Sequence, residues 1–554
     1  MRALAAVFIM LILSFRLSLA NSHAQPAGQR FVAIAFHDVV EAPQDLRTDS
    51  VTASDLVRLF DWLKGNGWSA ISLDDIAAAQ RGRPLPDKAV LLTFDDGFRS
   101  LYSHVFPLLT VYRYPAVAAL VGRWMEAPEG ATVQYEGGNV ARARFISWSE
   151  AREMQASGLV EFASHSYDLH HGIRANPQGN EIPAAIARRY DPARGYEDER
   201  QYAARIGDDL ATAKRQFLTQ LGRAPRALAW PFGRYHGTAL AQAKGLGFAF
   251  ALTLEQEPAF TSDPFAIARY FPTRAPNLGV MVADLRFEPP RPATRRIACV
   301  SLEAMAGTPG SAAQDALLGS TIDQLAALGA NTVVVNAGSG EEVFFSTPLR
   351  RLRSDVLSHA VWQLRSRLGA DVFVALPGAM AEPRLAAEMI RHVAADGLVL
   401  ESPVQSASPL AEARHAIRAR RAALDETSLD PATRRAVEVY RAGAAVDPRL
   451  RLMLALPQPG GPPEWADLAL LPPPADARTF VQTAHELQRQ DWFRPDVAGR
   501  VALSLPVAST QQVAALQSAQ RLGATAFAAC PAALLPPPPG LSAAFSAATF
   551  PYRP

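Results

Sequence analysis

Two neighbouring carboxylates, Asp95 and Asp96, follow directly after an apolar run that starts at Leu91, and Gly97 comes next. Two negative charges held this close repel each other unless a cation or a proton compensates them. Successive side chains leaving a strand diverge, so one aspartate can bind a metal while the other accepts a proton from water. A second interpretation stays open, because aspartate also favours the first turn of a helix.

A second polar segment, from His165 to His171, also follows an apolar run. His165 and His170 lie five residues apart, a spacing at which two imidazoles can converge on one cation. One aspartate and two histidines leave coordination positions open, as a catalytic metal site requires. We expect His171 and His104 to be ordinary polar surface residues instead.

The elements that must position these side chains follow a regular pattern from Arg30 onward. Short β-branched or aromatic runs alternate with amphipathic stretches such as 54–64 and 199–221. This alternation predicts parallel strands with crossover helices, hence an α/β barrel or a doubly wound sheet. Ligands of both folds bind at the carboxyl ends of the strands. The predicted strands are residues 31–36, 70–73, 89–94, 116–121, 160–163, 227–230 and 248–252.

A proline-rich segment at 287–292 interrupts the pattern, which begins again at Ile297. Eight predicted strands with helical stretches between most of them fit a second (β/α)8 barrel. We therefore predict an α/β protein with two domains, residues 30–288 and 295–554. The strands predicted for the second domain are residues 297–302, 332–336, 372–376, 397–400, 450–456, 468–471, 501–505 and 525–529.

The composition excludes several classes of protein. The chain has 554 residues, which is too long for one compact core, and its formal net charge is +2 without clustered Lys or Arg. We therefore expect no nucleic-acid partner. The two cysteines, Cys299 and Cys530, cannot form a disulfide framework or a cysteine-based zinc cluster. Any metal must then use histidine and carboxylate ligands.

Residues 1–24 have the pattern of a secretory signal peptide, with Arg2, an apolar run at 3–15 and small residues before the expected cleavage between Asn21 and Gln25. The apolar run is shorter than the ~20 residues of a membrane-spanning helix. We expect a periplasmic protein without a lipid anchor, since no cysteine lies near the cleavage site. An uncleaved membrane anchor is the alternative.

Three motifs resemble those of a known family. Thr93-Phe94-Asp95-Asp96-Gly97 and the segment from His165 to His170 resemble the first two motifs of the polysaccharide deacetylases (carbohydrate esterase family 4), which are metal-dependent. Trp230-Pro231-Phe232-Gly233 resembles the third motif. The upstream histidine motif at 36–39, the signal peptide and the second barrel most resemble the PgaB-type poly-β-1,6-N-acetyl-D-glucosamine N-deacetylases.

The resemblance implies a role for each residue at the strand ends. Asp96, His165 and His170 would hold one divalent cation, which could be Zn, Ni, Co or Fe. Asp95 would be the general base, and His37 the general acid that protonates the departing amine. It also implies a distorted (β/α) barrel for the first domain, which the second, (β/α)8-like barrel follows.

The third motif would line the substrate site through Trp230, Phe232 and Gly233. Trp230 has an alternative interpretation as a core aromatic residue. Arg226 and Arg269 could position Asp95, but arginine is abundant in this chain and the sequence does not distinguish between them.

The second barrel departs from the PgaB-type pattern. Those proteins carry an Asp-Asp pair after the fourth strand of this domain, whereas this chain has Glu401-Ser402-Pro403. Glycoside cleavage generally needs two opposed carboxylates, and only Glu303 and Glu401 stand out at strand ends. We expect this barrel to bind or guide a glycan rather than to cleave it.

The resemblance therefore implies a metal-dependent N-deacetylase that acts on an exported poly-N-acetylglucosamine, with an outer-membrane export porin as a further partner. Three alternatives stay open. The first is a deacetylase of another glycan, such as peptidoglycan or chitin oligomers. The second is a non-catalytic polysaccharide-binding export scaffold, and the third is a glycosidase that uses Glu303 and Glu401.

Overall fold

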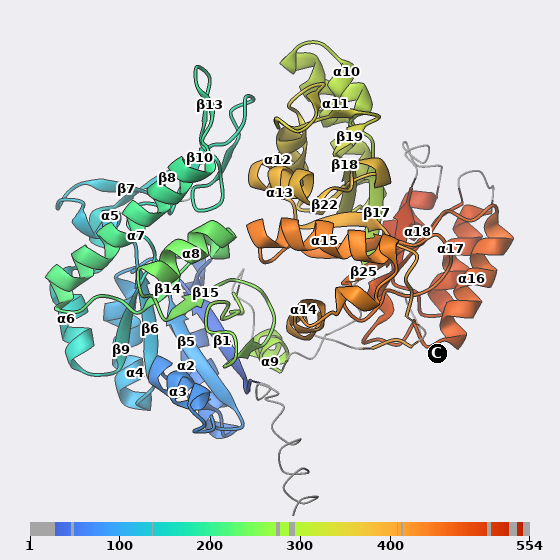
Figure 1. Ribbon diagram of the computed structural model, residues 1–554. Coiled ribbons are helices and arrows are strands. Elements are labelled where there is room, and N and C mark those ends of the chain that lie inside the picture. Colours follow the sequence, from blue (N-terminus) through green and yellow to red (C-terminus); the bar gives the residue numbers. More distant parts are fainter. Residues whose placement is uncertain are drawn as a thin grey trace, which may run out of the picture.

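The computed structural model describes two α/β domains that lie side by side (Figure 1). Among the described residues, no helix combines the length and the apolar character needed to cross a membrane. The predicted signal peptide and the proline-rich segment at 287–292 lie outside the described part of the chain. The described residues are 28–45, 49–135, 137–272, 278–286, 294–406, 408–410, 414–506, 511–530 and 540–546.

The first domain is built on one curved sheet in the order β15-β14-β9-β6-β5-β1-β16, with β4 also paired to β5. All neighbouring strands are parallel except β16, which is antiparallel to β1. Both faces of the sheet are buried, which explains why its strands are nearly continuous apolar runs. The strands are β1 (Arg30–Phe36), β4 (Ser69–Ala70), β5 (Ala89–Phe94), β6 (Ala116–Leu120), β9 (Val160–Ser164), β14 (Ala227–Ala229), β15 (Phe250–Leu252) and β16 (Ala259–Phe260).

An irregular segment, residues 267–270, closes this sheet into a distorted barrel. Ile267 bridges to Leu252 on β15, and Tyr270 bridges to Ile34 on β1. The backbone N–H of Tyr270 donates to the carbonyl of Ala33 at 2.8 Å. The predicted distorted barrel is confirmed, and its closure depends on a segment too short and irregular to be read as a strand.

Helices cover the outside of this barrel (Figure 1). The predicted helix at 199–221 is α7 (Glu199–Leu221), and the one at 54–64 lies within α2 (Ala53–Gly65). The predicted strand at 70–73 is wrong beyond Ala70. Ser72 caps α3 (Leu73–Gln80) by exchanging hydrogen bonds with Asp75, so the chain turns into a helix there.

The second domain is a closed barrel of eight parallel strands in sequential order, as predicted. Its interior is filled by alternate residues of these strands, including Ile297, Phe373, Val399 and Met453. The strands are β17 (Arg295–Val300), β18 (Thr332–Asn336), β22 (Asp371–Ala375), β23 (Gly397–Glu401), β24 (Arg451–Ala455), β25 (Leu468–Leu470), β26 (Val501–Ser504) and β27 (Ala526–Ala529).

A disulfide joins Cys299 on β17 to Cys530, which directly follows β27. The sequence excluded a disulfide framework but did not predict this single bond, because the pairing depends on the barrel bringing its first and last strands together. The two cysteines are 231 residues apart. A cross-link over so long a loop constrains the unfolded chain strongly, by about 5 kcal/mol in the chain-entropy model.

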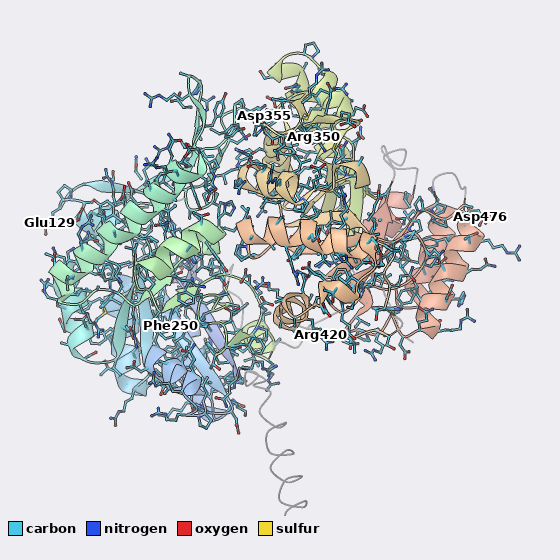
Figure 2. All side chains as sticks on the ribbon, viewed as in Figure 1. Glu129, Phe250, Arg350, Asp355, Arg420 and Asp476 are labelled. Atoms are coloured by element: carbon cyan, nitrogen blue, oxygen red, sulfur yellow. A yellow bond between two sulfur atoms is a disulfide. The ribbon has the colours of Figure 1, made fainter. Side chains whose placement is uncertain are left out.

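Polar contacts join the two domains. The Tyr196 hydroxyl donates to the Asp355 carboxylate at 2.7 Å, and the indole N–H of Trp362 donates to the Glu181 carbonyl at 2.8 Å. Figure 2 labels Asp355 where the two domains meet. Lower on the same boundary, α15 (Pro431–Val446) lies beside α8 (Gly237–Gly245) in Figure 1. The domains are therefore in direct contact along more than one element.

Candidate metal centre and active site

The predicted site residues come from the carboxyl ends of neighbouring strands. His37 follows β1, Asp95 and Asp96 follow β5, and His165 follows β9. The sheet order places β1, β5, β6 and β9 next to one another. Because these strands are parallel, their carboxyl ends meet at one rim of the barrel, and the side chains that follow them converge.

Asp96, His165 and His170 form a compact group of potential metal ligands. The Asp96 Oδ1 atom lies 3.4 Å from His165 Nε2 and 3.3 Å from His170 Nε2. The three ligand atoms all lie within 4.8 Å of one another. Asp96 Oδ1 is buried and has no hydrogen-bond partner among the described residues. An unsatisfied carboxylate oxygen facing two imidazole nitrogens fits a divalent cation.

The backbone is strained where this group forms. Asp96 and Ser166 have φ angles of 70° and 68°, in the left-handed region that residues other than glycine rarely occupy. Gly97 follows at φ 74°, and a Cβ atom there would lie 2.6 Å from Leu120. Such strain persists only where the surrounding structure enforces it, and it concentrates at functional sites.

The hydrogen bond of His165 selects the ring form that a metal requires. Its Nδ1 lies 2.8 Å from the Ala229 carbonyl oxygen and therefore carries the proton, which leaves Nε2 free to face Asp96. Burial opposes a positive charge on the ring, but the charges of Asp95 and Asp96 outweigh it and raise the pKa of His165. The negative field that favours an imidazolium also favours a bound cation.

His170 lies among aromatic rings and is slightly more exposed than His165. Its ring centre is 4.9 Å from that of Trp124 and 4.5 Å from that of Phe232. Burial lowers the pKa of His170 to about 4, against the opposing effect of the Asp96 charge. The ring is therefore neutral at physiological pH, which is the state of a metal ligand.

Asp209 on α7 holds the loop between the two histidines. Its carboxylate accepts hydrogen bonds from the backbone N–H groups of Tyr167 at 2.9 Å and Asp168 at 2.7 Å. Burial raises the pKa of Asp209 to about 6. Two backbone donors on one buried carboxylate set the path of the chain from His165 to His170.

Asp95 forms a bidentate ion pair with Arg269, which lies on the segment that closes the barrel. Both contacts measure 2.8 Å, and both side chains are buried. Burial opposes ionisation of Asp95, but the charges of Arg269 and then His165 outweigh it and lower its pKa. Arg226 pairs with Glu161 and Asp74 instead, so Arg269 is the residue that orients Asp95.

His37 lies on the opposite side of the two aspartates from the histidine loop, at the end of β1. Its charge contributes to lowering the pKa of both Asp95 and Asp96, so it lies within electrostatic reach of both. The ring packs against Phe271 at 4.7 Å between centres. The Nδ1 atom has no hydrogen-bond partner in the described part of the chain.

The third motif divides into a buried and an exposed part. Trp230 is fully buried and stacks on Tyr235 at 5.4 Å between ring centres, so the predicted contact of its side chain with a sugar is wrong. Phe232 is 43% exposed with a φ of 57°. Gly233 has a φ of 63°, and a Cβ there would lie 2.6 Å from Leu254, so only glycine fits.

A cleft of about 770 Å³ opens beside His170 and Phe232. Aromatic rings and hydrogen-bonding side chains both line it, a combination suited to sugar rings. The residues that line the cleft include Trp124, Glu126, Tyr167, Asp168, His170 and Phe232.

The second barrel has a separate cavity of about 580 Å³ at the carboxyl ends of its strands. Glu401 is the one carboxylate among its lining residues, which are mainly leucine, alanine and proline. The Glu303 carboxylate does not line this cavity and bonds to Ser339 and Arg353 instead. The described residues therefore offer no opposed carboxylate pair within this cavity.

Several residues of the site carry no local sequence signal. Asp209 lies in the middle of a helix, and Tyr135 and Asp49, which approach Asp96, stand far from every motif. Arg269 and Arg226 are both possible partners of Asp95 in the sequence, and no local signal distinguishes them. None of these four residues directly follows a central strand, so a search for polar residues at strand ends does not find them.

Known proteins that are similar to this chain include polysaccharide deacetylases. A family model described as polysaccharide deacetylase matches residues 82–251. The chain is 34% identical over 357 residues to the poly-β-1,6-N-acetyl-D-glucosamine N-deacetylase of Escherichia coli (strain K12), covering 63% of this chain and 53% of that protein. The deacetylase domain of BpsB from Bordetella bronchiseptica is 38% identical, covering 44% of this chain and 97% of that one with a TM-score of 0.40.

The fold and the group of Asp and His residues define the first domain as a polysaccharide deacetylase domain. The family model lies wholly within this first domain. A protein of the same name as the E. coli relative, from Staphylococcus epidermidis, is 25% identical over 228 residues, which is 41% of this chain and 69% of that protein. The chain spans about half the length of the E. coli relatives it matches.

We predict that Arg269→Met destabilises the first domain by about 3–5 kcal/mol, because it leaves the buried Asp95 carboxylate without its partner. Arg226→Met is the matched control, since it removes an arginine whose ion pairs are partly exposed and should cost about 0–1 kcal/mol. Urea-induced unfolding of the full chain measures both. An equal loss in the two variants would contradict the special role of the Asp95–Arg269 pair.

Proposed function

We propose that this protein is a metal-dependent hydrolase that removes N-acetyl groups from an exported poly-β-1,6-N-acetyl-D-glucosamine. The observation that carries the proposal is the group formed by Asp96, His165 and His170, with the ionised Asp95 beside it. The substrate class is taken from the curated relatives, which are named for this polymer. A cleft with exposed Phe232 next to the group supports a glycan substrate.

Asp96, His165 and His170 would hold the cation, and their nitrogen and oxygen donors suit Zn, Ni, Co or Fe. A divalent cation at this site supplies a Lewis acid that polarises the acetyl carbonyl and acidifies water. The open positions that two histidines and one aspartate leave are the ones that water and substrate need.

The chain's own groups move the protons. Asp95 accepts a proton from the attacking water, and its bidentate pair with Arg269 keeps the carboxylate ionised and fixed in direction. His37 donates a proton to the amine nitrogen as the C–N bond breaks, which releases acetate and leaves a free amino group on the polymer. An amide needs such a donor because its nitrogen is a poor leaving group.

The protein would act in the periplasm, where an outer-membrane porin would receive the modified polymer. The Cys299–Cys530 disulfide supports this location, since disulfides persist in oxidising compartments. Cell fractionation and N-terminal sequencing of the native protein test it. A mature N-terminus between Asn21 and Gln25 is expected, and an intact Met1 in the membrane fraction would contradict the cleaved signal.

Two substitutions separate metal binding from proton transfer. We predict that Asp96→Asn loses both metal and activity, whereas Asp95→Asn keeps the metal but loses at least about 100-fold in turnover, because its amide cannot accept a proton. Metal analysis and the release of free amines from a panel of acetylated glycans measure these effects. Full metal content in Asp96→Asn, or wild-type turnover in Asp95→Asn, would contradict the assigned roles.

For the second barrel we propose polymer handling without bond cleavage, because Glu401 is the one carboxylate among the described residues that line its cavity. We predict that the full-length protein leaves partly deacetylated polymer at its original length, and that Glu401→Gln does not change this. Size-exclusion chromatography of the polymer after incubation is the measurement. Shortening of the chain by the wild-type protein that disappears in Glu401→Gln would restore the glycosidase alternative.

A further inference from the structure

The second carboxylate oxygen of Asp96 has its own partner. Asp96 Oδ2 lies 3.0 Å from the Tyr135 hydroxyl, whereas Oδ1 faces the two imidazoles. The same hydroxyl makes a short hydrogen bond to the Asp49 carboxylate. One phenolic hydrogen therefore lies between two buried carboxylates, and only one of these belongs to the proposed metal site.

Tyr135 and Asp49 lie beside the metal-ligand group but do not belong to the central sheet. Tyr135 ends β7 (Thr132–Tyr135), and Asp49 lies just before β3 (Val51–Thr52). Both residues are only 5% exposed. Asp49 Oδ1 has no hydrogen-bond partner among the described residues, so the contact with Tyr135 is the polar anchor that the structure provides for this carboxylate.

Packing leaves the Tyr135 ring little freedom. Its centre lies 5.1 Å from that of Phe98 and 5.6 Å from that of Trp124, both in edge-to-face arrangements. Trp124 also packs against His170. The ring that carries the hydroxyl is thus held by the same aromatic group that holds one of the metal-ligating histidines.

We infer that Tyr135 is a positioning residue for the metal centre. The hydroxyl would hold Asp96 Oδ2 in place and leave Oδ1 facing the two imidazoles, where a cation would bind. This inference rests on the proposed function, because it concerns the metal that Asp96, His165 and His170 would hold.

The contact with Tyr135 would restrict how the Asp96 carboxylate binds the cation. A carboxylate free to rotate can offer both oxygens to a cation and fill a position that water or substrate needs. Groups that bond to the far side of a ligand fix its orientation, and their loss typically costs about 10–100-fold in metal affinity or activity. Tyr135 is the residue that meets this description for Asp96.

The test uses Tyr135→Phe, which removes the hydroxyl and keeps the ring. Tyr202→Phe is the matched control, since its buried hydroxyl donates to the Ala185 carbonyl on another part of the domain. The metal-free proteins are titrated with Zn²⁺ against a competing chelator, and the visible spectrum of the Co²⁺ forms reports the coordination of the metal. Thermal unfolding of the metal-free proteins measures the structural effect separately.

We expect Tyr135→Phe to bind Zn²⁺ about 10–100-fold more weakly and to alter the Co²⁺ spectrum. Tyr202→Phe should match the wild type in both measurements, even where its thermal stability falls. Equal affinity and an unchanged spectrum in Tyr135→Phe would overturn this inference alone. A wild-type protein that takes up no cation would overturn the proposed function and this inference with it.

Discussion

Two adjacent carboxylates buried at the end of one strand set the constraint on which the first domain depends. A buried charge is costly unless it is paired, and Asp95 and Asp96 are both almost inaccessible to solvent. The structure compensates them in different ways. Arg269 pairs with Asp95, whereas Asp96 faces two imidazoles and keeps one oxygen unsatisfied. This difference suits Asp95 to the proposed role of proton acceptor and Asp96 to the proposed role of metal ligand.

The closure of the barrel and the chemistry of the site depend on the same short segment. Residues 267–270 bridge β15 to β1, and Arg269 projects from this segment to Asp95. Its guanidinium also donates to the Thr93 hydroxyl and the Thr253 carbonyl, which lie on the two sides of the closure. The ion pair therefore links the completed barrel to the orientation of the proposed base. A change in this segment would affect the fold and the site together.

The second barrel has a complete fold, but few ionisable side chains are found among the described residues that line its cavity. Its eight strands close completely, and a disulfide joins the first strand to the end of the last. Yet the described residues that line its cavity are largely apolar and include one carboxylate, Glu401. Polar contacts such as Tyr196–Asp355 fix it against the first domain. A barrel can keep its shape through the packing of its interior while the residues at its rim change, since the rim contributes little to the core.

The sequence by itself determined most of the strands of both barrels, the long helix at 199–221 and the placement of Asp95, Asp96 and His165 at strand ends. These features follow from local periodicity and from the rule that parallel strands end at one rim. Only the tertiary structure decided that Arg269 rather than Arg226 pairs with Asp95, that Cys299 and Cys530 are joined, that Trp230 is buried, and that Tyr135 and Asp49 approach Asp96. Each of these is a contact between segments far apart along the chain, and no local pattern encodes the distance between such segments.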